Sequence, residues 1–280
     1  MIIDFHTHVF PKEIIDNRQK YIERDAWFAT CYGNPRAKMA DAETLVASMV
    51  SAGIDLSVVC GFCWRDAGLC AYHNDYLIEV ARIYGDRLVG FAIIPPSGGE
   101  SAVAELERCL AGGLRGVGEV NADAQGFALT DVDRLEPFVQ ALVKFDVPLL
   151  LHVSEPVGHV YPGKGSAFPE IVYRFIARYP ELRLVCAHWG GGLPFYELMP
   201  EVAEAARNVC YDTSASSLLY RPDIVKVVPP IVGSDKVVFG TDYPLLRQDR
   251  LLTIVRNLGL DHGVLDGILG ANAIRLLKYG

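Results

Sequence analysis

The chain has 280 residues, of which 51% are hydrophobic and 21% charged, and its formal net charge is −8. This composition is typical of a globular protein with a large core and excludes a disordered chain. The acidic balance and the lack of a basic run disfavour a nucleic-acid partner, because such binding depends on clustered Lys and Arg. The sequence contains neither a leader-like N-terminus nor an apolar run of about 20 residues, so we expect a cytoplasmic protein without a membrane partner.

Eight apolar segments of strand length follow one another, separated by segments of helical character. The first strand is predicted within residues 1–10, and the others over 56–62, 87–94, 114–120, 148–154, 182–188, 208–214 and 236–242. Segment 11–39 lacks periodicity and is predicted to be a long loop with at most a short helix. Helices are predicted over 41–53, 71–84, 101–111, 168–179, 193–207 and 223–228. Another helix is predicted to begin at residue 130, and further helical segments are predicted between the eighth strand and the C-terminus.

Local signals define several helix boundaries. Ser97 and Glu100 fall at capping-box spacing before segment 101–111, and Pro200 predicts a kink or a break in segment 193–207. His73 and His262 do not fall at the ends of predicted strands, and we assign both to surface helices.

Strict alternation of strand and helix, repeated eight times, predicts an α/β protein, a (β/α)8 TIM barrel formed by a single domain over residues 1–280. Strands that are apolar throughout fit this fold, because helices cover both faces of such strands. The alternative is an open doubly wound sheet, which would need a glycine-rich turn after the first strand. The chain has His-Thr-His at that position.

The first strand ends with two histidines separated by one residue, His6 and His8. Alternate side chains of a strand point the same way, so these two imidazoles can bind one ion. Four later strands also end with a polar residue that can bind metal or transfer protons: Glu119, His152, His188 and Asp242. Active sites of TIM barrels lie at this end of the strands, and leaving such groups buried and unpaired would cost several kcal/mol each. The pattern therefore predicts a metal site.

Four motifs carry a resemblance to a known family: Asp-Phe-His-Thr-His, Leu-Leu-Leu-His-Val, Leu-Val-Cys-Ala-His-Trp-Gly-Gly-Gly and Val-Phe-Gly-Thr-Asp-Tyr-Pro. In this order they resemble the amidohydrolase superfamily, in particular its amidohydrolase-2 branch, which includes the aminocarboxymuconate-semialdehyde decarboxylase-like enzymes. The resemblance spans nearly the whole chain and implies a distorted TIM barrel with a divalent metal, most often zinc.

The resemblance also implies roles for single residues. His6, His8, His152 and Asp242 match metal ligands, and His188 matches a histidine that is catalytic in mononuclear members and a ligand in binuclear ones. Glu119 is similar to a metal-bridging glutamate of TatD-type hydrolases. A site with two metal ions is therefore an alternative, although we favour a site with one.

A cation lowers the pKa of a bound water from about 15.7 toward about 7, so hydroxide forms at neutral pH. With Asp242 accepting its proton and His188 as general acid or base, the sequence predicts a metal-dependent hydrolase acting on an amide, lactone or ester bond. The alternative is a metal-dependent decarboxylase. A PHP-type phosphoesterase and a non-catalytic metal-binding barrel are less favoured, and the oligomeric state is left open.

Loops after the strands usually select the substrate, which we expect to be a small, carboxylated molecule. Two loops and the turn after the sixth strand carry the candidate substrate-binding residues: Glu155, His159, Tyr161, Lys164, Trp189 and Arg247. Lys164 and Arg247 are candidates for binding a carboxylate, although either fits an ordinary surface charge equally well.

Overall fold

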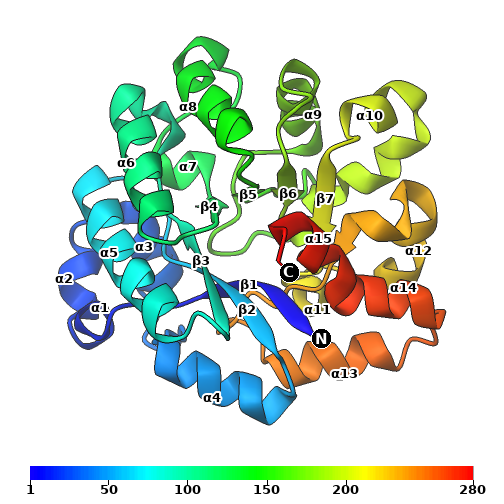
Figure 1. The fold of residues 1–280 in the computed structure, drawn as a ribbon, viewed down its shortest axis with the longest axis horizontal. Helices are drawn as coiled ribbons and strands as arrows, with labels where there is room; N and C mark the ends of the chain where they lie inside the picture. The colour runs from blue at the N-terminus through cyan, green and yellow to red at the C-terminus, as the bar shows by residue number, and fades with distance from the viewer. Residues whose placement is uncertain (280) are drawn as a thin grey trace.

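The computed structural model describes residues 1–279. It contains one parallel sheet whose eight strands follow the order of the chain (Figure 1). Their bounds are β1 Ile3–His8, β2 Leu56–Cys60, β3 Leu88–Ala92, β4 Gly116–Val120, β5 Leu149–Leu151, β6 Leu184–Cys186, β7 Val209–Asp212 and β8 Val237–Val238. The sheet curls until the segment after β8 meets β1, where Thr7 and Tyr243 form a parallel bridge. The predicted (β/α)8 barrel is confirmed.

Helices surround the barrel and connect successive strands. In chain order they are α1 Lys12–Asp16, α2 Arg18–Ile22, α3 Ala26–Tyr32, α4 Ala42–Ala52, α5 Ala67–Ile83, η1 Pro96–Gly98, α6 Glu100–Ala111, α7 Ala122–Gln125, α8 Val132–Phe145, α9 Pro169–Arg178, η2 His188–Leu198, α10 Pro200–Ala205, α11 Ser216–Leu219, α12 Ile224–Val232, η3 Ser234–Lys236, α13 Gln248–Arg256, α14 His262–Asp266, η4 Gly267–Ala271 and α15 Asn272–Leu277. None of the described helices is long and apolar enough to cross a membrane.

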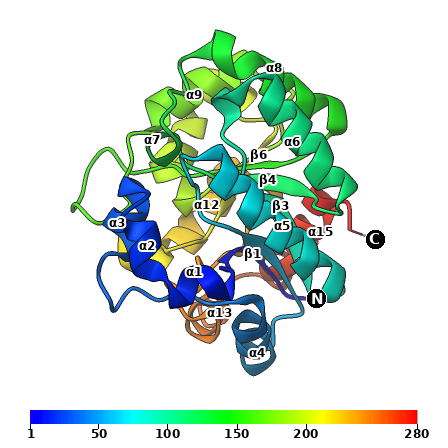
Figure 2. The ribbon, with the colours of Figure 1, turned by 90° about the vertical axis from the view of Figure 1, so that its left-hand side faces the viewer.

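The segment predicted as a loop, 11–39, contains three short helices, α1 to α3. Asp25 caps α3 by accepting a hydrogen bond from the backbone N–H of Phe28 at 2.8 Å. The Phe28 ring is fully buried and stacks on Tyr32, with ring centroids 4.8 Å apart. Aromatic packing therefore orders a segment whose sequence has no helical periodicity. Figure 2 shows α3 beside the loop that follows β5, where Gly163 lies close to the Cys31 sulfur.

One predicted helix cap and one predicted helix start are wrong. The capping box does not form, because α6 begins after Gly99, whose φ of 59° favours glycine, and no side chain caps it. Helix α5 begins at Ala67, four residues earlier than predicted, because Asp66 accepts a hydrogen bond from the Leu69 N–H. The predicted break at Pro200 is confirmed, since Pro200 is the first residue of α10.

His262 lies exposed on α14 as predicted, but the prediction of a surface position for His73 is wrong. The His73 ring is fully buried, donates from Nε2 to the Val9 carbonyl at 2.8 Å and accepts at Nδ1 from the Trp64 indole N–H at 3.0 Å. Burial lowers the pKa of His73 to about 4. The ring is therefore a neutral hydrogen-bonding link between the end of β1 and the segment after β2.

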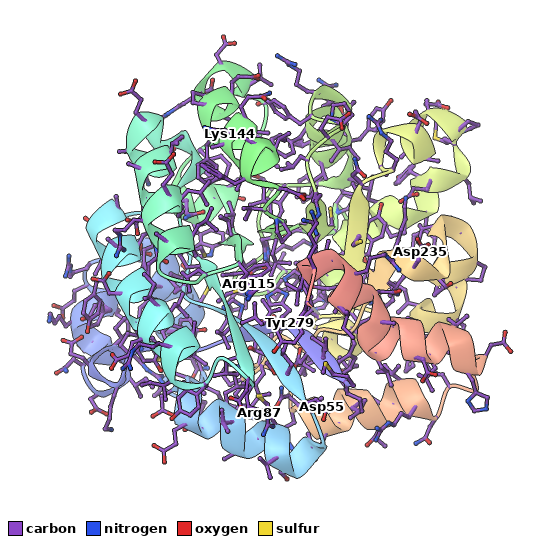
Figure 3. All side chains as sticks on the ribbon, viewed as in Figure 1. Asp55, Arg87, Arg115, Lys144, Asp235 and Tyr279 are labelled. Atoms are coloured by element: carbon purple, nitrogen blue, oxygen red, sulfur yellow. The ribbon has the colours of Figure 1, made fainter. Side chains whose placement is uncertain are left out.

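The two ends of the barrel differ in character. Asp55, Arg87, Arg115 and Asp235 lie just before β2, β3, β4 and β8, and Figure 3 labels them at the end of the barrel that faces the viewer. Arg87 donates two hydrogen bonds to the backbone carbonyls of Ile54 and Asp55, which is a structural role. The histidines of the predicted metal site lie at the opposite ends of the strands.

We predict that His73→Leu lowers the free energy of unfolding by about 2–4 kcal/mol at pH 7, because the Trp64 N–H and the Val9 carbonyl lose their partner. The neutral ring contributes stability that is lost as the pH falls from about 6.5, the unfolded pKa, to about 4. Urea unfolding should therefore show that the difference in the free energy of unfolding between His73→Leu and wild type becomes smaller as the pH falls to 4.5.

The matched control is His262→Leu on the exposed face of α14, which should change the free energy of unfolding by no more than about 0.5 kcal/mol at either pH. Equal effects of the two substitutions would contradict the structural role of His73.

Candidate metal centre and cavity

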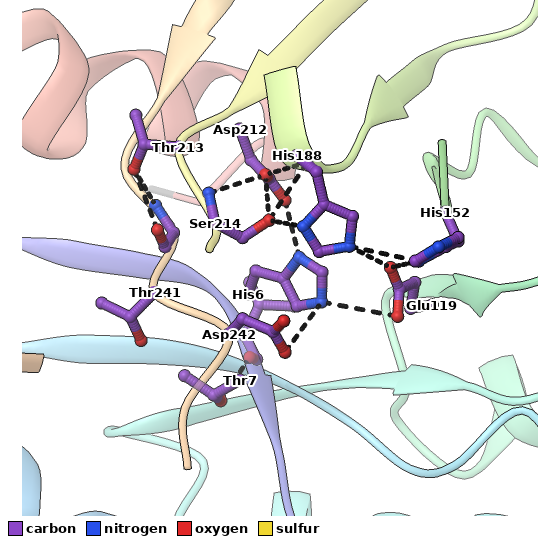
Figure 4. Close-up of polar contacts among 12 residues, drawn as sticks. His6, Thr7, Glu119, His152, His188, Asp212, Thr213, Ser214, Thr241 and Asp242 are labelled. Carbon is purple, nitrogen blue, oxygen red and sulfur yellow. Dashed lines mark hydrogen bonds and ion pairs between the residues drawn. The ribbon is translucent and has the colours of Figure 1, made fainter. Parts of the chain in front are cut away.

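All six residues singled out at the strand ends lie at one end of the barrel, and Figure 4 labels five of them, His6, Glu119, His152, His188 and Asp242. His6 and His8 end β1, Glu119 lies on β4, His152 directly follows β5, His188 begins η2 after β6, and Asp242 follows β8. Each of these side chains is buried or nearly so. The polar groups therefore form one cluster inside the rim of the barrel.

The first pair of imidazoles is oriented by its surroundings. His6 Nδ1 lies 2.7 Å from Asp212 Oδ2, and His8 Nδ1 lies 3.0 Å from the Gly61 carbonyl oxygen. Both partners accept hydrogen bonds, so each neutral ring carries its proton on Nδ1. The two Nε2 atoms, only 3.1 Å apart, then face each other with lone pairs. These lone pairs repel unless a cation lies between them, which is the arrangement that a metal site needs.

Glu119 lies between this pair and a second one. Its Oε2 is 3.7 Å from the Nε2 atoms of both His6 and His8, and its Oε1 is 2.9 Å from His152 Nδ1 and 3.2 Å from His188 Nε2. His6, His8 and Glu119 thus form one group that could hold a metal ion, and Glu119, His152 and His188 form another.

Asp242 joins the first group, with its Oδ1 3.3 Å from His8 Nε2 and 4.0 Å from His6 Nε2. Bonds of about 2.0–2.2 Å from a tetrahedral ion place its ligands about 3.3–3.6 Å apart, close to these separations. The residues therefore fit a divalent cation. The structure divides the predicted ligands, because His152 lies with His188 on the other side of Glu119.

The charges of the cluster depend on one another. Burial raises the pKa of Glu119, but the imidazoles of His152 and His6 hold it well below its usual range. Burial lowers the pKa of His188, whereas its hydrogen bond to Glu119 and the nearby carboxylates raise it to about 9. The pKa of His6 is likewise raised well above its usual value, since Asp212 and Glu119 outweigh burial. These carboxylates need positive charge beside them, which protons or a metal cation can supply.

An unusual turn positions His188. The backbone is left-handed from His188 to Gly192, with φ between 56° and 99°, and Trp189 is buried within it, its indole N–H donating to Ser216 Oγ at 2.7 Å. Gly191 packs against the loop after β5, because a Cβ atom there would lie 2.2 Å from the Ser154 carbonyl oxygen. The glycines therefore permit both the turn and the close approach of two backbones.

Two residues of the site, Asp212 at the end of β7 and Ser214 after it, were not predicted from the sequence. Asp212 accepts from His6 Nδ1, and Ser214 Oγ lies 2.8 Å from His188 Nδ1. Both side chains are fully buried. A signal was present, since Asp212 occupies the same place at a strand end as the residues that were identified.

A cavity of about 600 Å³ opens above the cluster. Its walls include the aromatic side chains of Trp27, Tyr32, Phe62 and Tyr161. Two cations, Arg36 and Lys38, also line it, and neither has an acidic partner within 4.0 Å among residues 1–279.

These two cations lie in the segment between α3 and α4 and were not predicted from the sequence. The Arg18 guanidinium shapes this segment by donating to the backbone carbonyls of Asn34, Pro35 and Ala37. Arg36 and Lys38 reach the cavity because of these contacts between residues far apart in the sequence. Two basic residues therefore line the cavity although the chain as a whole is acidic.

The predicted substrate-binding residues of the loop after β5 lie in different places. His159 and Tyr161 line the cavity. Glu155 is buried behind Tyr161 and accepts its hydroxyl hydrogen bond at 2.9 Å. Lys164 is directed into its own loop, where Nζ donates to the carbonyls of Val157 and His159.

The other two predicted residues do not line the cavity. Trp189 is buried within the η2 turn, and Arg247 is exposed and paired with Asp249. The cations that line the cavity are thus Arg36 and Lys38, and not Lys164 or Arg247.

We predict that Gly191→Ala lowers the free energy of unfolding by more than about 2 kcal/mol, because the added methyl group meets the Ser154 carbonyl and the φ of 59° disfavours alanine. Urea unfolding measures the effect. Gly263→Ala in α14 is the control, since nothing lies within 4 Å of its Cβ position, and it should change stability by no more than about 1 kcal/mol. An unchanged free energy of unfolding in Gly191→Ala would show that this turn does not require glycine.

Comparison with known proteins corrects the predicted reaction. The chain is similar to a 2-amino-3-carboxymuconate-6-semialdehyde decarboxylase of Dictyostelium discoideum, with 24% identity covering 98% of this chain and 91% of the relative. It is also similar to a gamma-resorcylate decarboxylase of Polaromonas sp. strain JS666, with 24% identity covering 73% of this chain and 74% of the relative. These similar proteins are carboxy-lyases, so the prediction of a hydrolase is wrong and the decarboxylase alternative is favoured.

The fold is shared with solved structures. A 5-carboxyvanillate decarboxylase from Novosphingobium aromaticivorans, in complex with manganese and 4-hydroxy-3-methoxy-5-nitrobenzoic acid, superposes with a TM-score of 0.81 at 21% identity, covering 99% of this chain and 96% of the other. The sequence pattern of one family, described as amidohydrolase, matches residues 3–279. Because this match spans nearly the whole chain, the protein belongs to the amidohydrolase family.

Proposed function

We propose that the protein is a metal-dependent decarboxylase of a small, planar, carboxylated molecule. The observation that carries the proposal is the meeting of metal-type donors with an aromatic cavity whose lining includes the unpaired cations Arg36 and Lys38. Aromatic walls suit a ring or a conjugated chain, and guanidinium and ammonium groups suit its negative charge. The names of the similar decarboxylases support the same class of reaction.

The proposed cation is held by His6, His8 and Asp242, with Glu119 beside it. When bound, a divalent metal supplies Lewis-acid stabilisation of negative charge on substrate oxygens. Imidazole and carboxylate ligands suit both the zinc expected from the sequence and the manganese found with a similar decarboxylase. His152 was predicted as a further ligand and lies across Glu119, so its part in binding the first ion stays a prediction.

The chain's own residues can perform the remaining steps. Decarboxylation breaks a carbon–carbon bond, releases CO₂ and leaves an electron pair that must take up one proton. His188 Nε2 and the Asp242 carboxylate both line the cavity, and we assign proton transfer to this pair. Arg36 and Lys38 attract the substrate, while the aromatic side chains orient its plane.

The first prediction of this proposal concerns the metal. The purified protein should contain about one divalent ion per chain by elemental analysis, and the double substitution His6→Ala and His8→Ala should remove it. The double substitution His159→Ala and His262→Ala, which removes two histidines outside the cluster, should retain the ion. Full metal content after loss of His6 and His8 would contradict the assignment. A content near two would show that Glu119, His152 and His188 bind a second ion.

The second concerns the reaction. Incubation with 5-carboxyvanillate, 2,6-dihydroxybenzoate and related unsaturated carboxylic acids should release CO₂ from at least one of them, with solvent hydrogen taking the place of the lost carboxylate. Asp242→Asn should lower kcat by about 10²-fold or more, because a proton-transfer group is lost. The control Asp249→Asn, which disrupts only an exposed ion pair, should be near wild type. Cleavage of esters or lactones without CO₂ release would refute the proposal.

A further inference from the structure

One buried carboxylate contacts two histidines of the cluster. Asp212, at the end of β7, lies with Oδ2 2.7 Å from His6 Nδ1. Its Oδ1 accepts three hydrogen bonds, from the backbone N–H groups of His188 and Ser214, each at 2.9 Å, and from the Ser214 hydroxyl at 2.5 Å. Asp212 is 0% exposed, so water does not compete for these contacts.

Ser214 extends the contact to the ring of His188. A serine hydroxyl has a single proton, and here it is donated to Asp212 Oδ1. The Ser214 oxygen must therefore accept at its other two contacts, which are the His188 backbone N–H at 3.1 Å and His188 Nδ1 at 2.8 Å. His188 therefore keeps one proton on Nδ1, and its Nε2, 3.2 Å from Glu119 Oε1, is the nitrogen that gains or loses the second proton.

The same carboxylate sets His6 directly. Because Asp212 Oδ2 accepts from Nδ1, His6 Nε2 is left with a lone pair directed at the proposed metal position. His6, Asp212, Ser214, His188 and Glu119 thus form a closed ring of contacts, visible in Figure 4. Within this ring, Glu119 lines the cavity, whereas Asp212 is fully buried away from it.

We propose that Asp212 and Ser214 are positioning residues that keep His6 Nε2 unprotonated toward the metal position and fix His188 Nε2 as the nitrogen that exchanges protons at the cavity. Asp212 acts on the candidate metal ligand His6 and, through Ser214, on the candidate proton-transfer residue His188. A single buried carboxylate therefore couples metal binding to proton transfer. The part that concerns proton transfer rests on the proposed decarboxylation, whereas the part that concerns metal binding does not.

Asp212→Asn gives the sharpest test. Three donors converge on the Oδ1 side, so the amide oxygen of the variant must stay there, and its NH₂ group must face His6 Nδ1. His6 then carries its proton on Nε2, which points at the metal position. We expect metal affinity, measured by titration against a competing chelator, to weaken by about 10- to 100-fold, with kcat reduced as well.

Ser214→Ala separates the two functions, because it removes the contact with the His188 ring and one of three hydrogen bonds to Asp212 Oδ1 but leaves the contact of Asp212 Oδ2 with His6. Metal affinity should stay within about twofold of wild type, while kcat should fall by about 10- to 100-fold with little change in KM. In the zinc-loaded protein labelled with ¹⁵N-histidine, the protected imidazole N–H signal of His188 should disappear. Thr213→Val is the matched control, since this neighbouring buried hydroxyl contacts only the backbone of Gly240, and it should leave all three measurements unchanged.

The outcomes are distinguishable. Wild-type metal affinity in Asp212→Asn, or a retained His188 signal in Ser214→Ala, would overturn the positioning role. If the wild-type protein binds metal but decarboxylates none of the acids tested, the proposed function fails, and the affinity and ¹⁵N measurements still decide the role of Asp212 and Ser214. Equal loss of metal affinity in Thr213→Val would show a general packing effect and would also overturn the inference.

Discussion

The closure of the barrel is the constraint on which the site depends. The Phe5 N–H donates to the Phe239 carbonyl at 2.7 Å, the Asp242 N–H donates to the His6 carbonyl at 2.8 Å, and the His8 N–H donates to the Tyr243 carbonyl at 2.7 Å. These backbone bonds join the two ends of a sheet whose strands otherwise pair only with their neighbours in the chain. Without these bonds, nothing would hold His8 of β1 close to Asp242 after β8.

Closure places acids and imidazoles in a region that water hardly reaches, and the arrangement is stable only if each group has a partner. Most of the partners lie behind the site. Asp212 supports His6 and His188, and the Gly61 carbonyl supports His8. A group of this kind left without a partner costs more than a hydrogen bond contributes, so these supporting residues matter as much as the ligands.

Much of the fold and part of the site could be predicted from the sequence. Periodicity and alternation are local properties, and they revealed the eight strands and the polar residues that end them. The capping box at Ser97 failed because spacing alone does not show which residue caps a helix. His73 was misplaced because a helical pattern does not show what packs above it, and here Trp64 and Val9 cover the ring. Arg36 and Lys38 were missed because Arg18 places them through contacts that no periodicity reveals.

The choice of reaction was beyond the sequence for a chemical reason. Imidazoles and carboxylates around a cation suit the activation of water and equally suit the loss of CO₂. We infer that the shape and charge of the cavity, to which segment 11–39 and the loop after β5 contribute lining residues, select between the two reactions. The sequences of those segments lack periodicity, and residues such as Tyr161 acquire their position only from tertiary contacts.

The cations lining the cavity also affect how fast a substrate arrives. The chain has a net charge of −8, whereas the field of two positive charges, Arg36 and Lys38, acts at the wall of the cavity. A field of this kind guides a negatively charged molecule during diffusion, and dissolved salt screens it beyond about 8–10 Å at ionic strengths near 0.1–0.15 M. The second-order rate constant for capture of an anion should therefore fall as ionic strength rises, while a neutral molecule of the same size would be captured at a rate independent of salt.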